Sequence, residues 1–348
     1  MMTDAFGAAR AVIVRGLDQR AFPAAVVNVG GRAGSRWHEA FGRLTYSDTA
    51  PACDTATIFD LASLTKVIAT TSLAMTHVDA GRLAIETRVA GVMADWDAND
   101  RAAITIRHLL EHSSGLPARV PGWQQTTGRD GFRQLILSTP LERQPGGAAV
   151  YSDVDFMLLG LLIEQIGSAP LDHQLSTVFG RSLDPIQYRP MAHLYERTAP
   201  TEFDPWRGRV LCGEVHDENA AAIGGVAGHA GLFGTAEAVG AFARLVLRTF
   251  DQPTVLGTPE LMRTFAARSS VPGSSRALGW DTALPTSSSG RRMSPRAIGH
   301  TGFTGTSLWI DEENDLYVVL LTNRVHPTRT NEKLLPLRGE FHDALPRR

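Results

Sequence analysis

The chain has 348 residues, of which 43% are hydrophobic and 20% charged, a composition that is typical of a folded globular protein and excludes a disordered one. The formal net charge of -2 at pH 7 provides no basic surface for nucleic acid or an anionic membrane. The length suits two lobes better than one small domain.

The chain offers no sign of export or of a disulfide framework. Charges interrupt the first 20 residues, and no later run approaches the roughly 20 apolar residues that span a bilayer. Cys53 and Cys212 are far apart and lack metal-ligand spacing, so we expect two free thiols. We therefore predict a cytoplasmic protein, with a removed leader as the open alternative.

Strands are predicted near the N-terminus, after a first helix over residues 4–19. The β-branched run at 24–30 ends in glycines, and residues 36–47 alternate in part, which indicates a hairpin. A helix rich in alanine then runs to about residue 79 and ends before Gly81.

The middle of the chain reads as mainly helical. One helix is expected to start at the cap Thr105 and end by Gly115, and another to start at Ser152 and end at Gly167. Residues 180–222 show weak periodicity, so we predict a long irregular connection there.

The C-terminal part begins with an amphipathic helix over 235–250 and ends with a hairpin, in which residues 305–311 and 316–323 flank a turn. Strands at both ends and helices between them predict an α+β fold whose ends meet in one antiparallel sheet flanked by helices. We expect an α/β lobe from 1–80 and 235–348, a mainly helical lobe from 81–234, and the active site between them.

Lys66 is one of only two lysines, beside 32 arginines. It stands three residues after Ser63 at a predicted helix start, so the two side chains share one helix face. Serine becomes a nucleophile when a base takes its proton, and a buried lysine can lose its own proton, which arginine does not. The alternative is a solvated lysine beside a serine helix cap.

Two further stretches suggest catalytic chemistry. Tyr151 precedes a helix, with Asp153 two residues later, and a phenol there can shuttle a proton. His300, Thr301 and Gly302 enter a C-terminal strand, where glycine permits close approach of a substrate to the backbone. The structural alternatives are a packed aromatic beside a helix cap and an ordinary glycine-rich turn.

In this order the three stretches resemble the serine β-lactamase and penicillin-binding-protein superfamily, especially its class C-like esterase and D-aminopeptidase branch. The phrases at 109–117 and 224–239 are also similar to that family, and the resemblance covers roughly residues 20–330. It implies an antiparallel sheet packed with helices, an all-helical lobe, and a site between them.

The resemblance also implies roles for individual residues. Ser63 is the expected nucleophile, Lys66 its proton acceptor or activator, and Tyr151 the partner base that protonates the leaving group and activates water. The backbone N–H groups of Ser63 and Phe303 are the expected oxyanion hole, and Asp153, His300, Thr301 and Gly302 the expected substrate contacts.

Two positions depart from the family pattern. Asp153 replaces the usual Asn, and near Lys66 its charge would hold the ammonium protonated and make Tyr151 the stronger base. His300 replaces the usual lysine of the K-T-G element and is mostly neutral near pH 7. Both changes predict a more negative site, poor turnover of β-lactams, and a preference for a neutral ester, an amide or a substrate with a free amine.

Other polar residues are weaker candidates. His112 and Ser113 are expected to be helix-end structure, and the Arg-rich segment 322–333 a solvated surface. The run from His216 to Asn219 can line the pocket or form caps and ion pairs. His216 and His229 belong to no recognisable zinc motif, so we predict no metal and no cofactor, with a zinc hydrolase as an alternative.

These residues predict a serine hydrolase that acts through an acyl-enzyme on a small-molecule or peptide substrate, such as an ester, an amide or a D-amino acid peptide. An acyltransferase that passes the acyl group to an alcohol or amine is one alternative. A non-catalytic binding module on the same scaffold is another. The oligomeric state is open.

Overall fold

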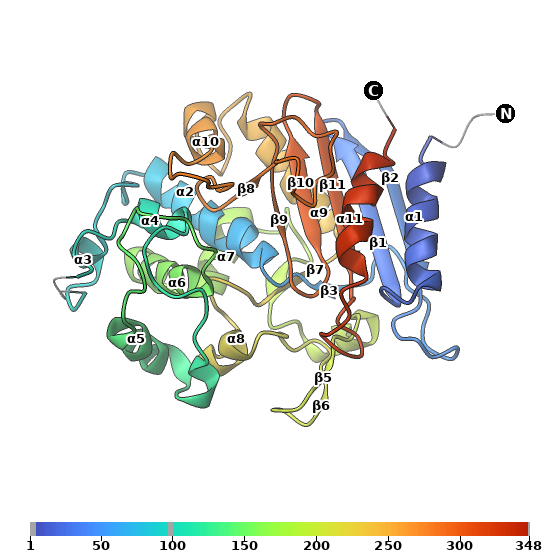
Figure 1. Cartoon of the computed structure of the whole chain (residues 1–348), viewed down its shortest axis with the longest axis horizontal. Coiled ribbons are helices and arrows are strands. Elements are labelled where there is room, and N and C mark those ends of the chain that lie inside the picture. Colours follow the sequence, from blue (N-terminus) through green and yellow to red (C-terminus); the bar gives the residue numbers. More distant parts are fainter. Residues whose placement is uncertain (1–4, 97–99, 347–348) are drawn as a thin grey trace.

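A six-stranded antiparallel sheet joins the two ends of the chain in the computed structural model, which describes residues 5–96 and 100–346 (Figure 1). In order across the sheet the strands are β2 (Gly34–Gly42), β1 (Ala24–Gly31), β11 (Leu316–Thr322), β10 (Ser307–Asp311), β9 (Ile298–Thr301) and β8 (Asp281–Thr282). β1 pairs with β11, with Val27 opposite Leu320. The predicted meeting of both chain ends in one sheet is confirmed.

Helices cover both faces of this sheet. α1 (Gly7–Asp18) and α11 (Leu334–Asp343) pack on one face, and α9 (Ala236–Thr249) packs on the other (Figure 1). Val27 of β1 belongs to the core with α1 and α11, while Val26 belongs to the larger core that α9 shares. Because both faces are covered, β1 is an almost continuous apolar run instead of an alternating one. The predicted helix start at residue 4 lies outside the described residues.

The remaining elements surround the larger core. The helices are α2 (Ser72–Asp79), α3 (Val89–Val92), α4 (Ile106–Leu110), α5 (Gly128–Ser138), α6 (Asp153–Gly167), α7 (Leu171–Phe179), α8 (Glu218–Ile223), α10 (Pro259–Ala266), the π-helix η1 (Lys66–Thr71) and the 3-10 helices η2 (Gly122–Gln124) and η3 (Ala192–Arg197). The short strands are β3 (Phe59–Asp60), β4 (Gln187–Tyr188), β5 (Phe203–Asp204), β6 (Arg209–Val210) and β7 (Leu232–Gly234). The segment expected to be irregular therefore contains short strands and helices. The lobe boundaries at 81 and 234 stay a prediction.

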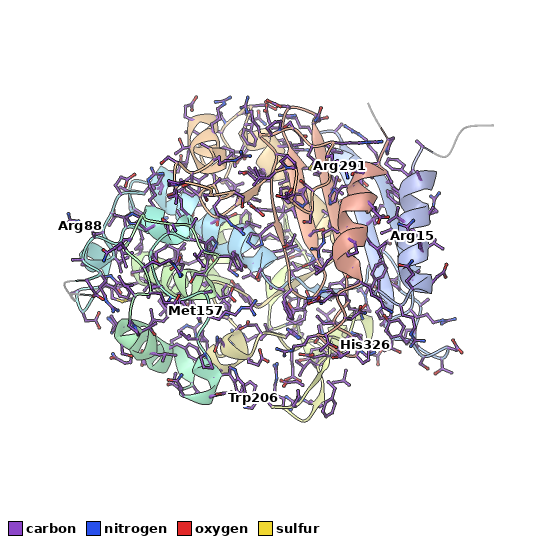
Figure 2. All side chains as sticks on the ribbon, in the orientation of Figure 1. Arg15, Arg88, Met157, Trp206, Arg291 and His326 are labelled. Carbon is purple, nitrogen blue, oxygen red and sulfur yellow. The ribbon has the colours of Figure 1, made fainter. Side chains whose placement is uncertain are left out.

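α6 is the central helix of the helical region. Its residue Met157 is 2% exposed and lies inside the packing, whereas Arg15, Arg88 and Arg291 are exposed at the periphery (Figure 2). Within the described part of the chain no single helix is long and apolar enough to cross a membrane, and only the bent pair α6–α7 passes by length and composition. Cys53 and Cys212 are both free thiols, as predicted.

Candidate active site

Ser63 lies in the turn between β3 and η1. Ala62 adopts a left-handed conformation, with φ of 47°, and this reverses the chain just before the serine. The N–H groups of Leu64, Thr65 and Lys66 then donate to carbonyl oxygens three residues back, which starts the helix. Ser63 therefore stands at the beginning of a helix, as predicted.

Lys66 and Tyr151 both reach the hydroxyl of Ser63. The Lys66 Nζ donates to Ser63 Oγ over 3.0 Å, and the Tyr151 hydroxyl donates to the same oxygen over 2.9 Å. Tyr151 comes from the segment before α6, 88 residues along the chain. The fold thus brings together the three side chains that the sequence predicted to act as a unit.

The ammonium of Lys66 is fully buried and has a partner for each of its three hydrogens. Besides Ser63 it donates to Asp153 Oδ1 over 2.7 Å and to the carbonyl oxygen of His229 over 3.1 Å. Burial opposes the charge, but the negative groups at Asp153 and Tyr151 outweigh it and raise the pKa of Lys66 above its usual value. The alternative in which Asp153 keeps Lys66 protonated is the one that the structure favours.

Neutral and cationic groups surround the ring of Tyr151. The ring centre lies 4.7 Å from that of His112, and Lys66 Nζ and the Arg276 guanidinium each lie 4.9 Å from it. Burial and the nearby Arg276 and Lys66 charges lower the pKa of His112 well below its usual value, so this ring is neutral. His112, which the sequence assigned to a helix end, therefore also forms one wall behind the phenol.

The H-T-G element follows β9 into the site. The His300 Nδ1 donates to the carbonyl oxygen of Thr301 over 2.8 Å, and burial lowers the pKa of His300 well below its usual value. A Cβ at Gly302 would lie 2.0 Å from Thr306 Oγ1 and 2.8 Å from the carbonyl oxygen of Leu61, so only glycine allows this approach. The expectation of a neutral His300 and of a tight glycine contact agrees with these distances.

Two backbone N–H groups are free to bind a substrate oxygen. Within residues 5–96 and 100–346, neither the N–H of Ser63 nor that of Phe303 donates to a protein acceptor. Both residues line the same cavity, and Gly302 brings their two segments into contact. This is the arrangement that an oxyanion hole needs.

The cavity at Ser63 has a volume of about 700 Å³. Among the described residues it is lined by five arginines, Arg119, Arg276, Arg324, Arg329 and Arg338, and by four carboxylates, Asp153, Asp217, Glu218 and Asp281. The prediction of a site biased toward negative charge is therefore wrong. Sequence reasoning missed these arginines because they are spread over distant segments.

Segment 322–333 contributes two of these arginines and is not a solvated surface. Arg324 is 6% exposed and its guanidinium lies 4.8 Å from the centre of the Phe303 ring, while Arg329 binds Glu202 and Glu218. The expectation for this segment is wrong because the chain after β11 turns back across the mouth of the cavity. Arginine alone does not distinguish a buried guanidinium from an exposed one.

Arg324 and Arg338 stand out among the arginines of the cavity. Neither has an ion-pair partner within 4.0 Å among the described residues. Arg338 is 4% exposed, and burial together with the charge of Arg324 lowers its pKa to about 10. A buried cation without a counter-ion favours a bound anion.

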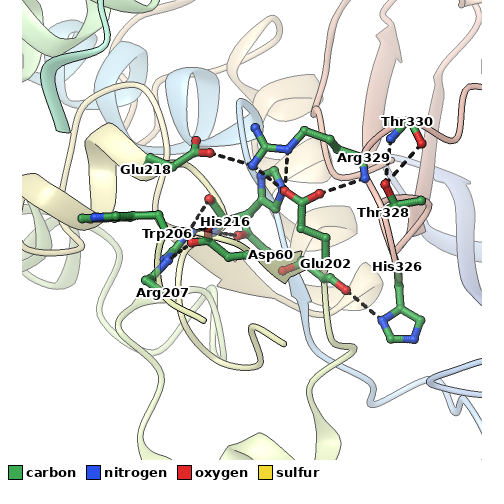
Figure 3. A network of polar contacts seen from close by, with 12 residues as sticks. Asp60, Glu202, Trp206, Arg207, His216, Glu218, His326, Thr328, Arg329 and Thr330 are labelled. Atoms are coloured by element: carbon green, nitrogen blue, oxygen red, sulfur yellow. Dashed lines mark hydrogen bonds and ion pairs between the residues drawn. The ribbon is translucent and has the colours of Figure 1, made fainter. Parts of the chain in front are cut away.

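The run from His216 to Asn219 both lines the cavity and forms ion pairs, so the two alternatives for it hold together. His216 Nε2 binds Glu202 over 2.8 Å, and Glu202 also binds Arg329 (Figure 3). His229 Nε2 binds Asp217 over 2.8 Å. Since each histidine has a carboxylate partner, the described residues contain no group of three or more ligands that could hold a metal.

Comparison with known proteins agrees with this geometry. The family model described as Beta-lactamase matches residues 9–342 of the chain. The chain belongs to the Beta-lactamase family. It is a serine hydrolase of that family, with the β-lactamase and penicillin-binding-protein fold that the sequence predicted.

Curated and structural relatives extend the Beta-lactamase family assignment. A protein of Escherichia coli (strain K12) named "Putative D-alanyl-D-alanine carboxypeptidase" is 33% identical over 305 residues, which cover 78% of this chain and 70% of that protein. Simvastatin synthase (LovD) from Aspergillus terreus superposes with a TM-score of 0.78 at 18% identity, covering 98% of each chain. EstCE1, a hydrolase with promiscuous acyltransferase activity, superposes with a TM-score of 0.77 at 18% identity, again covering 98% of each chain.

Proposed function

We propose that this protein cleaves an amide bond in a peptide with a free C-terminal carboxylate, through an acyl-enzyme on Ser63. The observation that carries the proposal is the contact of Ser63 Oγ with both Lys66 and Tyr151, at 3.0 Å and 2.9 Å. A serine at a helix start, with two proton-active groups on its oxygen, suits nucleophilic catalysis.

In this mechanism Tyr151 in its phenolate form accepts the hydroxyl proton as Ser63 Oγ attacks the carbonyl carbon. The C–N bond then breaks, and Tyr151 returns the proton to the leaving amine. Water attacks the ester in the same way and releases the acid and the free serine. The N–H groups of Ser63 and Phe303 hold the carbonyl oxygen while it is negative, and each is worth about 3 kcal/mol in the transition state.

Lys66 acts as a fixed cation in this mechanism. Its raised pKa keeps the ammonium charged, so it stabilises negative charge on the Ser63 and Tyr151 oxygens instead of removing a proton itself. Arg276 lies beside the same ring and adds to this field. Tyr151 is therefore the general base of the proposal.

The substrate class follows from Arg324 and Arg338, which line the cavity without ion-pair partners among the described residues. A carboxylate beside the scissile bond would supply the missing negative charge. The name of the Escherichia coli relative supports the same class, since a carboxypeptidase removes a residue that bears a carboxylate. Asp153 and His300 still predict poor turnover of β-lactams.

The decisive experiment compares two peptides ending in D-Ala-D-Ala, one with a free carboxylate and one amidated. We expect faster release of D-alanine from the free acid than of its amide from the other peptide. Arg324→Gln should remove most of that difference, and Ser63→Ala should abolish both reactions. Equal rates for the two peptides in the parent protein would contradict the proposed substrate class.

Intact-mass spectrometry after exposure to a fluorophosphonate tests the acyl-enzyme itself. We expect one added phosphonyl group on the parent protein and none on Ser63→Ala. An unlabelled parent would favour a binding module, and loss of activity on exhaustive chelation would favour a zinc hydrolase. If an added alcohol or amine appears in the product, the protein transfers the acyl group as well.

A further inference from the structure

Asp60, the last residue of β3, is a buried carboxylate three positions before Ser63. It is 2% exposed, and both of its oxygens accept backbone N–H groups. Oδ1 accepts from Ala62 over 2.8 Å, and Oδ2 accepts from His216 over 2.7 Å. A carboxylate whose removal from water is compensated only by backbone donors fixes the positions of the segments that supply them.

The bond to Ala62 stabilises an unfavourable conformation. An alanine with φ of 47° lies in the left-handed region, which costs an L-residue about 1 kcal/mol or more. Asp60 Oδ1 offsets that cost by closing an Asx-type turn on the Ala62 N–H. Because the peptide between Ala62 and Ser63 follows this residue, the conformation of Ala62 sets the direction of the Ser63 N–H.

The backbone of Asp60 also holds the second free N–H. Its carbonyl oxygen accepts a hydrogen bond from Thr304 Oγ1 over 2.8 Å, and Thr304 directly follows Phe303. Thr306 Oγ1 donates to the next carbonyl oxygen, that of Leu61, over 3.0 Å. The turn that contains Phe303 is therefore docked on Asp60 and Leu61.

Asp60 supports the side chain of Phe303 through His216. The Asp60 carboxylate holds the backbone of His216, whose ring stacks on the Phe303 ring with centres 5.6 Å apart. The ring of His216 is held in turn by Glu202, and Glu202 by Arg329 (Figure 3). The side chain and the backbone of one residue thus reach both free N–H groups.

We propose that Asp60 is a positioning residue that aligns the N–H groups of Ser63 and Phe303 on the oxygen of the tetrahedral adduct. The role rests on the proposed acyl-enzyme at Ser63. Misaligned donors weaken binding of the tetrahedral state more than binding of the substrate. The signature of the role is a fall in kcat and in affinity for a tetrahedral mimic, with little change in KM.

Phenylboronic acid serves as the tetrahedral mimic. Ser63 Oγ forms a bond to boron, the hydroxyl proton leaves to solvent, and boron becomes a four-coordinate anion with an oxygen in the place of the substrate oxyanion. Hydrolysis of p-nitrophenyl acetate gives kcat and KM in the same buffer. Together the two measurements separate alignment of the N–H groups from substrate binding.

Asp60→Asn and Thr304→Val are the test variants. Asn keeps the shape of Asp60 but turns one acceptor into a donor, and Val removes only the Thr304 hydroxyl. We expect both to lower kcat about 10- to 100-fold and to weaken inhibition by phenylboronic acid by a similar factor, with KM within about threefold. Thr304→Ser keeps the hydroxyl and should resemble the parent protein.

Asp54→Asn is the matched control, because Asp54 Oδ1 accepts the Ala56 N–H over 2.9 Å in the same type of turn on an exposed segment. Parent-like kcat in Asp60→Asn, or a loss of kcat without a loss of boronate affinity, would overturn the role. If Asp60→Asn does not fold, equal kcat in Thr304→Val and Thr304→Ser would overturn it. A parent protein that the fluorophosphonate leaves unlabelled would instead overturn the proposed function.

Discussion

Lys66 shows what a single residue contributes to this site. Its compact ammonium directs one hydrogen each to Ser63, Asp153 and His229, in three directions that a planar guanidinium cannot match. The sequence argument favoured lysine because lysine can lose its proton. The structure supports a different reason, since Asp153 keeps the ammonium charged.

Asp153→Asn tests that reason through the pH dependence of activity. The Asp153 charge raises the pKa of Lys66 against burial, so its removal leaves burial to lower that pKa. If catalysis needs the ammonium, the alkaline limb of the kcat/KM profile moves to lower pH. A shift of the acid limb to lower pH instead would identify Lys66 as the base, and the exposed Asp48→Asn should leave both limbs in place.

At the scale of elements, the start of α6 positions Tyr151 and Asp153. Ser152 Oγ accepts the Asp155 N–H over 3.1 Å and donates to the Pro117 carbonyl oxygen over 2.8 Å, and its own N–H donates to His112 Nδ1 over 3.1 Å. The sequence predicted this cap correctly from a Ser-Asp pair before an apolar run. The cap therefore serves both the helix and the site.

We predict that Ser152→Ala lowers the free energy of unfolding by about 1–2 kcal/mol and kcat/KM by about 10-fold or more, because Tyr151 and Asp153 flank the cap. Thr258→Ala removes the equivalent cap of α10, which is remote from the cavity. It should cost about 1 kcal/mol of stability without changing kcat/KM. Urea unfolding and steady-state kinetics measure the two effects, and equal kcat/KM in both variants would contradict the prediction.

At the scale of the whole molecule, burial of imidazole makes stability depend on pH. The pKa values of five buried or half-buried histidines are lowered, chiefly by burial, at His77, His112, His300, His326 and His342. Above pH 6.5 these groups are neutral in the folded and the unfolded chain. As the pH falls, the unfolded chain takes up protons that the folded chain excludes, so stability is lost.

His342, whose pKa burial lowers to about 3, is expected to account for up to about 1.4 kcal/mol of this loss for each pH unit below 6.5. His342→Gln should therefore make the decline of unfolding free energy between pH 6.5 and pH 4.5 less steep. Thr258→Ala should lower stability with the parent steepness. Urea unfolding at several pH values measures the slopes, and an unchanged slope in His342→Gln would contradict the prediction.

Local patterns were sufficient where neighbours in the chain set the structure. The Ser152 cap, the hairpin of β10 and β11 and the spacing of Ser63 and Lys66 are local, and all three agree with the structure. The segment at 322–333 failed because its arginines look the same whether they face solvent or the cavity. The role proposed for Asp60 could not be read from the sequence either, because its partners Thr304 and His216 lie far along the chain.

The sequence by itself determined the α+β class, the family and the nucleophile motif, since hydrophobic periodicity, helix caps and residue spacing act over a few residues. Only the tertiary structure decided the charge on Lys66, the five arginines around the cavity and the alignment of two backbone N–H groups. Those properties depend on distances between segments and on exclusion of water, which arise when the chain is packed.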